Sequence, residues 1–289
     1  MNYRIKYNLI LISLFFAFVS CEKDLNTKVV ISPKLCFNCI LNPDSLIHGS
    51  LSLSQSISEE KTFVKIDHAT IELKKDGQLI GTMQNTGNGI YRLNIKPSSG
   101  SFYEISIAAE GLPILHASTT VPEKPPVSYR LDNQEYQDAG LYSSYYTYRI
   151  TYTIQDKPGA NRYWHYKMRY INYNGFYWLF FDINSTIIDD FNKVTDSSQR
   201  YGYYYMYYLR INDIQADGKT LTFTDLSYDK DVVYFMDTDE HYDKYMKSTI
   251  KQRINDGDNL LFNEPVQIYT NIENGFGIFG SAAIISYKL

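Results

Sequence analysis

The feature that most constrains the fold is a period of two in hydrophobicity, repeated in short segments between residues 29 and 121. In one of these segments Tyr103, Ile105 and Ile107 alternate with polar or small residues. The others are 34–41, 50–57, 69–74 and 91–95. Alternation of this kind predicts strands that bury one face, and no helical pattern separates them. Residues 29–122 are therefore expected to form an Ig-like or prealbumin-like β-sandwich.

Turn residues lie where the predicted strands end. Asp76-Gly77 is a strong hairpin signal, and Gly87-Asn88-Gly89 marks the next turn. The segment Val121–Pro126 holds three prolines in five residues, and proline cannot continue a strand ladder. We therefore predict a domain boundary there, followed by a second domain over residues 127–289.

The second predicted domain is antiparallel β and rich in tyrosine. The chain contains 28 Tyr, and with 15 Phe and 2 Trp the aromatic fraction is 16%. Tyrosine is a strand former with an apolar body and a polar tip. The predicted strands are 146–154, 164–170, 203–211, 221–223 and 232–236. The whole chain is thus expected to be all-β with one helix.

That helix is predicted near 238–254. Asp237 is in position to cap it, with Glu240 three residues later, and Asn255–Asp258 would end it. One face has helical spacing, formed by Tyr242, Tyr245, Met246, Thr249 and Ile250. We expect this helix to pack over an open sheet edge or a barrel end.

Residues 1–20 have the composition of a signal peptide. Arg4 and Lys6 precede the apolar run Leu9–Val19, which is too short for an ordinary membrane helix. The run ends in Ser20-Cys21, which resembles a bacterial lipoprotein signal in which Cys21 would take the lipid. The alternative is a plain secretory signal with a chance cysteine.

Residues 21–28 are polar and predict a tether behind the lipid. Glu22 and Asp24 resemble the export signal of some Gram-negative lipoproteins that reach the cell surface. No second long apolar run follows, so the lipid at Cys21 would be the membrane anchor.

Net charge argues against a nucleic-acid partner. The chain carries −4, and removal of residues 1–20 takes away Arg4 and Lys6 and leaves −6. An acidic chain of pI about 5.8 lacks the basic surface that a phosphate backbone requires.

Cys36 and Cys39 form a C-x-x-C pattern that could indicate a redox pair or half of a zinc site. They lie in the predicted strand 34–41, where positions three apart point to opposite faces. The two sulfurs would then diverge, so we interpret both cysteines as strand residues.

Sequence motifs of catalysis are scarce. The five histidines lack zinc-ligand spacing, and the chain contains neither a Gly-x-Ser-x-Gly elbow nor a P-loop. His165 lies on a polar strand face, and the aspartates at 225–231 and 256–258 read as solvated turns. We expect no enzyme activity, no metal and no cofactor, although a spatially paired set of carboxylates, as in a glycoside hydrolase, stays open.

Exposed aromatic residues are the main candidates for a contact surface. The run Phe176–Phe181 is apolar on both faces, and tyrosines occupy both faces of 203–208. Exposed Tyr and Trp stack on sugars or anchor protein partners, while the alternative is an ordinary core. Our candidate binding residues here are Tyr177, Trp178, Tyr204 and Tyr208.

The C-terminal segment 263–280 is the most specific stretch of the sequence. Gly275, Gly277 and Gly280 stand between large apolar residues, which indicates close backbone approach or a tight corner. Asn271 and Asn274 suit turns or side-chain bonds to buried backbone. A structural corner is one interpretation, and a ligand or partner loop that includes both asparagines is the other.

This segment resembles the signature of the domain of unknown function 4249 family, which consists of bacterial outer-membrane lipoproteins. The resemblance extends to 33–35, 69–73, 119–122 and the helix at 241–250, and covers essentially the whole mature chain. It implies a location on the outer membrane and a role beside a TonB-dependent transporter of the nutrient-uptake type. It supplies no catalytic residues.

These observations lead to three functional hypotheses. The first is a non-catalytic binding accessory of a TonB-dependent nutrient transporter, anchored through Cys21. The second is a structural or adhesive surface lipoprotein, and the third is a hydrolase with a hidden carboxylate pair.

Overall fold

The structure is a computed structural model of the chain. It describes residues 32–55, 63–137, 145–156, 158, 164–170, 208–212, 218–228, 232–257 and 266–288. The described residues from Pro33 onward belong to one compact unit. The predicted signal peptide, its cysteine and the tether (1–28) lie outside the described residues, as do Tyr177, Trp178 and Tyr204.

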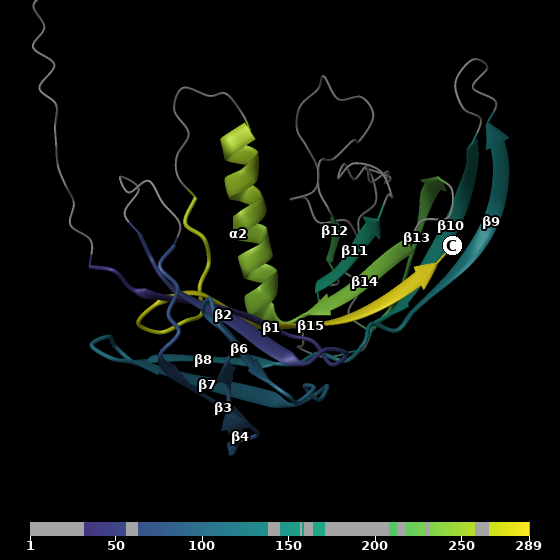
Figure 1. Cartoon of the computed structure of the whole chain (residues 1–289). Helices are drawn as coiled ribbons and strands as arrows, with labels where there is room; N and C mark the ends of the chain where they lie inside the picture. The colour runs from purple at the N-terminus through teal and green to yellow at the C-terminus, as the bar shows by residue number, and fades with distance from the viewer. Residues whose placement is uncertain are drawn as a thin grey trace, which may run out of the picture. The chain divides into compact units, whose positions relative to one another are not determined.

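The described strands form three sheets (Figure 1). The largest has the order β12-β11-β14-β15-β1-β2-β6-β5. Its strands are β1 (Leu35–Leu41), β2 (Ile47–Leu53), β5 (Gln84–Asn85), β6 (Ile90–Leu93), β11 (Trp164–Tyr170), β12 (Tyr208–Asn212), β14 (Val232–Thr238) and β15 (Phe276–Lys288). A second sheet, β4-β3-β7-β8, contains β3 (Ala69–Lys75), β4 (Gln78–Thr82), β7 (Phe102–Ala109) and β8 (Leu115–Thr120). A third, β13-β10-β9, contains β9 (Val127–Gln137), β10 (Tyr145–Gln155) and β13 (Thr220–Tyr228).

The prediction of an all-β fold is confirmed, and a sandwich holds the main core. That core joins side chains of β1, β2, β6 and β15 to side chains of β3, β7 and β8. Leu35, Phe37, Cys39 and Leu41 are all buried, as the alternation in β1 predicts. Ile71 and Leu73 in β3, and Ile105 and Ile107 in β7, face them from the opposite sheet. Asp76 and Gly77 form the predicted hairpin turn, with φ of 50° and 81°.

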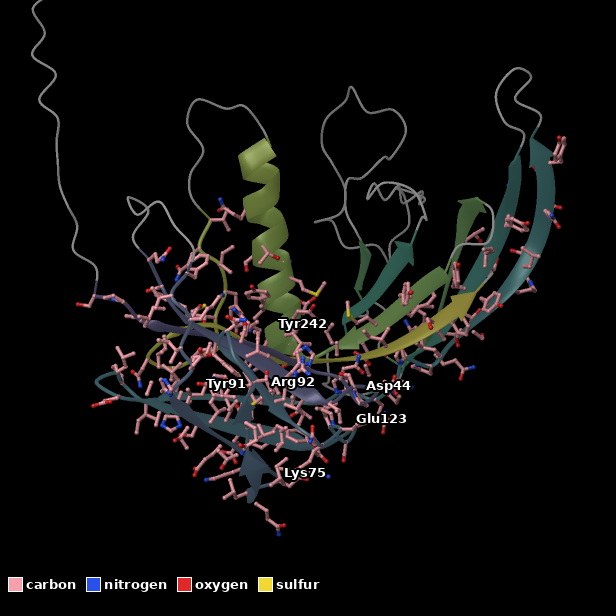
Figure 2. The ribbon with its side chains drawn as sticks, in the orientation of Figure 1. Asp44, Lys75, Tyr91, Arg92, Glu123 and Tyr242 are labelled. Atoms are coloured by element: carbon pink, nitrogen blue, oxygen red, sulfur yellow. The ribbon has the colours of Figure 1, made fainter. Side chains whose placement is uncertain are left out.

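Two tyrosines show how this residue serves the core. Tyr91 is buried, and its hydroxyl donates to the Ile66 carbonyl (3.0 Å) and accepts from the Ala69 amide (3.0 Å) (Figure 2). The Tyr103 hydroxyl accepts from the Ser98 amide (2.9 Å). Each phenol fills apolar space while its oxygen satisfies loop backbone, which removes the cost of burying an unpaired polar group.

The C-terminal strand pairs with the first strand of the sandwich. β15 runs parallel to β1, from Cys36 opposite Phe276 to Leu41 opposite Ser281. β15 also pairs antiparallel with β14, so one sheet joins strands from both sides of the predicted boundary at Val121–Pro126. The large sheet therefore crosses the predicted boundary, while β4-β3-β7-β8 lies before it and β13-β10-β9 after it.

Aromatic rings fill the space between the third sheet and the β14–β15 part of the large sheet. Tyr152 of β10 lies 4.9 Å from Phe235 of β14, centroid to centroid. Tyr129 of β9 lies 4.8 Å from Tyr287 of β15. In β10 the even positions Ile150, Tyr152 and Ile154 are buried, which confirms the predicted half-buried strand.

Helix α2 (Glu240–Gly257) covers the other face of the large sheet. Met246 of α2 packs with Met236 of β14 and Ala282 of β15, joined by the partly buried Tyr242 and Ile284. The helix exists as predicted, but its N-cap was assigned wrongly. Asp237 is a buried strand residue opposite Ala283, and Asp239 caps the helix by accepting from the Tyr242 amide (2.9 Å). β14 continues two residues further than the alternation of apolar residues indicated.

The two cysteines behave as strand residues, as predicted. Cys39 lies in the core, where burial raises the pKa of its thiol to about 12. Cys36 faces the opposite side of β1 and is partly buried, and both thiols are free. Among the residues with described placement, no cluster of three or more His, Cys, Asp or Glu could hold a metal ion. The described helix is not apolar enough to cross a membrane.

The junction of β1 and β15 depends on a missing side chain. Gly277 has φ of +104°, and a Cβ atom there would lie 2.0 Å from the carbonyl oxygen of Phe37. The predicted close backbone approach in the tail is thus confirmed at this glycine.

Gly277→Ala should destabilise the fold by about 3 kcal/mol or more, since left-handed backbone strain adds to a clash with a strand carbonyl. Gly87→Ala is the matched control: φ there is +96°, but nothing lies within 4 Å of its Cβ position. It should cost only about 1–2 kcal/mol of strain. Urea denaturation of the two variants would measure the difference, and equal losses would contradict the steric explanation.

Candidate functional site

The C-terminal segment covers the outer edge of β8. Four alternate carbonyls of that edge each accept a hydrogen bond from the segment or from β15. The donors are Asn274 Nδ2 to Ile114 O (3.1 Å), Glu273 N to His116 O (2.8 Å), Asn271 Nδ2 to Ser118 O (3.1 Å) and Ser281 Oγ to Thr120 O (2.8 Å). An exposed edge is a template for pairing with another strand, and here it is closed mainly by side chains.

Asn271 also takes part in the turn that leads into β15. Its Nδ2 donates to the Phe279 carbonyl (2.8 Å), and its Oδ1 accepts from the Phe279 amide (3.0 Å). The side chain therefore imitates the hydrogen-bonding edge of a neighbouring strand. Asn274 adopts φ of 64°, a left-handed conformation that asparagine tolerates better than most residues.

The predicted structural corner is confirmed for both asparagines by these internal bonds. Their alternative role, in binding a ligand or a partner, stays a prediction. The sequence indicated that they bond to backbone, but the backbone groups of Ile114 and Ser118 lie more than 150 positions away, so no local pattern identifies them.

Asp239 joins three elements at the start of α2. Its Oδ1 accepts from the Tyr242 and Ser281 amides (2.9 and 3.0 Å), and its Oδ2 accepts from Thr119 Oγ1 (2.6 Å). Burial raises the pKa of this carboxyl, and the three donors oppose that rise. Gly280 leaves room for the arrangement, because a Cβ there would lie 2.9 Å from Cβ of Tyr242, the first-turn residue labelled in Figure 2.

A second cluster joins the first turn of α2 to the C-terminal segment. The His241 Nδ1 and the Tyr269 hydroxyl lie 2.7 Å apart, with the two rings stacked. Lys244 lies over the Tyr269 ring (5.7 Å) and pairs with Glu240 (2.7 Å). Burial raises the pKa of the Tyr269 phenol, which keeps it a neutral hydrogen-bonding group. These contacts attach the segment to the helix. They could not be predicted from the sequence, since no spacing rule links positions 241 and 269.

β9 carries three exposed apolar side chains, Tyr129, Leu131 and Tyr136, and we call these three residues the β9 face. Leu131 is opposite Ile150, and Tyr129 is opposite Tyr152, so these side chains share one side of the sheet. Leu131 is 51% exposed and Tyr136 58%. The sequence of β9 does not predict this face, because one arginine and two acidic residues interrupt its apolar pattern.

Among the predicted aromatic candidates, only Tyr208 falls within the described residues. It begins β12, with its backbone opposite Met168 of β11, and its side chain is not described. Tyr177, Trp178 and Tyr204 lie outside the described ranges, so the predicted contact surface there is not tested. His165 belongs to β11, and its side chain is likewise outside the description.

The chain is an all-β protein whose C-terminal segment 263–280 carries the signature of one protein family. The model of the family called domain of unknown function (DUF4249) matches residues 22–288. The chain therefore belongs to this family, as the sequence resemblance predicted.

The other comparisons add little. No curated protein matches the chain at a significant level. A crystal structure of a Salmonella alpha-2-macroglobulin mutant aligns with 72% of this chain at 12% identity and a TM-score of 0.24. The aligned part spans only 13% of that chain, and at this score no argument rests on the similarity.

The corner yields a graded prediction. Asn271→Ala should destabilise the fold by about 3 kcal/mol, because it leaves Phe279 N, Phe279 O and Ser118 O without partners. Asn274→Gly keeps the left-handed backbone accessible, loses one exposed bond and should cost about 1 kcal/mol. Thermal and urea unfolding would compare them, and an Asn271→Ala variant as stable as Asn274→Gly would contradict the proposed edge closure.

Proposed function

We propose that this protein is an outer-membrane lipoprotein that acts as a non-catalytic binding accessory of a TonB-dependent nutrient transporter. The observation that carries the proposal is the place where the family match begins. It starts at residue 22, directly after Cys21, so the apolar leader and the matched chain meet at the cysteine that the lipoprotein signal would modify.

The association with a TonB-dependent transporter follows from the family resemblance, and the β9 face supports a binding role. Leu131 and Tyr136 present apolar and aromatic surface on a sheet whose far side carries polar residues such as Thr151 and Thr224. Tyrosine is enriched where proteins contact partners, since it offers a large rigid area at low entropic cost. The accessory would work through contacts at such a surface.

The anchor is tested by Cys21→Ala. Without the thiol, no lipid can be attached, so the protein should leave the membrane fraction and appear in soluble fractions. Cys36→Ala is the matched control, because Cys36 is a partly buried strand residue and its variant should stay with the membrane. Metabolic labelling with a radioactive fatty acid would report the modification itself. Membrane retention and labelling of Cys21→Ala would refute lipidation.

The accessory role is tested by affinity purification from detergent-solubilised membranes. The native protein should recover a barrel protein of the TonB-dependent class. Tyr136→Asp should reduce that recovery about tenfold or more, since an exposed aromatic anchor becomes a charge. Leu79→Asp is the control, with the same 58% exposure on β4 of another sheet. Purification without any barrel protein would favour the alternative of a structural or adhesive lipoprotein.

A further inference from the structure

One end of the sandwich gathers the start of the described chain and exposed apolar side chains. We call it the tether end and define it by Lys34, Phe63, Val64, Ile114 and Phe276. β1 and β15 run parallel and both begin here, with Cys36 opposite Phe276 (Figure 1). β2 finishes at the same end, because Leu53 is opposite Leu35.

Backbone contacts hold these residues next to one another. The Ser54 amide donates to the Lys34 carbonyl (2.8 Å), and the Leu53 amide donates to the Val64 carbonyl (2.9 Å). On the other sheet, β8 starts here: a Cβ on Gly275 would meet both Leu35 and Leu115, the neighbour of Ile114. The four apolar members thus belong to adjacent segments.

Their side chains reach solvent. Phe63 is 58% exposed and Phe276 42%, and Val64 and Ile114 are also exposed. Lys34 places its Nζ 5.3 Å from the centre of the Phe276 ring, and Lys65 is exposed beside Val64. Three exposed acidic residues also lie at this end: Glu273 before Asn274, Glu110 in the turn before β8 and Asp67 two residues after Lys65. Aromatic and aliphatic tips flanked by lysines are the composition of a surface that enters the headgroup region of a bilayer.

The chain enters the described structure at this end, which favours the bilayer as the occupant. Cys21 precedes Pro33 by 12 residues, which span at most about 40 Å when fully extended. The opposite end of the sandwich lies a further strand away, about 24 Å for the seven residues of β1. A lipid on Cys21 therefore holds the tether end closest, along the chain, to the membrane.

We propose that the tether end rests on the phospholipid leaflet that carries the Cys21 lipid, with Phe63, Val64, Ile114 and Phe276 in the interface and Lys34 and Lys65 at the phosphates. The inference rests on the proposed lipid anchor. It adds an orientation: the opposite end of the sandwich stays available for a partner while the chain is anchored.

Quenching by brominated acyl chains tests this orientation. The lipidated mature protein would be reconstituted in vesicles of phosphatidylethanolamine and phosphatidylglycerol, with and without bromine on the acyl chains. Phe63→Trp and Phe276→Trp add a reporter at the tether end. Phe102→Trp is the control, since Phe102 is 41% exposed and lies opposite Thr120, at the other end of β8. Unsubstituted protein supplies the background emission of Trp164 and Trp178.

The added emission of Phe63→Trp and Phe276→Trp should fall at least about twofold in brominated vesicles. Interfacial residues enter the boundary between headgroups and acyl chains by about 5–10 Å, which brings the indole close to the quenching bromine. Phe102→Trp should not change. If bromine reduces the added emission of all three variants on vesicle-bound protein by the same factor, the orientation is wrong and the anchor stays intact.

Flotation of the vesicles separates the two proposals. Protein that fails to float with the vesicles would refute the lipid anchor, and the orientation with it. The emission of the two tether-end reporters could also be unaffected by bromine and change only when solubilised outer-membrane protein is added. In that case this end contacts a protein and the bilayer assignment is wrong.

Discussion

The parallel pairing of β1 with β15 is the interaction on which the other features depend. It places the last described strand of the chain beside the first, so the sandwich and the β14–β15 layer share one sheet. Gly277 makes this contact possible, because its missing side chain lets its backbone approach the Phe37 carbonyl. Neighbouring strands lie about 4.8 Å apart, which leaves no room for a side chain directed at the adjacent backbone.

The same strand organises the polar contacts around it. Ser281 follows in β15, and its backbone and hydroxyl bond to Asp239 and Thr120, which belong to the helix cap and to β8. Asn271 bonds to Phe279 and to Ser118, so the segment before β15 closes the edge of the second sheet. The edge of β8 is thus closed by the chain's own side chains, and the proposals rest on two other surfaces, the β9 face and the tether end.

Features with a short-range cause could be predicted. Strand positions such as Ile71 and Leu73 followed from alternation, because a half-buried strand repeats every two residues. The hairpin at Asp76-Gly77 followed from turn chemistry, and the divergence of Cys36 and Cys39 followed from strand geometry. The predicted position of the helix cap was wrong by two residues. Asp237 and Asp239 are equivalent as local signals, and only the pairing of β14 with β15 as far as Thr238 distinguishes them.

The sequence by itself determined the all-β class, the tail glycines at close backbone contacts and the membership of the family, because each can be recognised from short segments read one at a time. Only the tertiary structure decided that β15 lies beside β1, that Asp239 meets Thr119, and that Leu131 and Tyr136 share an exposed face. Those contacts join residues that are far apart in the chain or depend on which face another layer covers. No periodic pattern in the sequence records which distant residues come into contact or which sheet face another layer covers. The free energy that selects these arrangements comes from packing of the whole sheet.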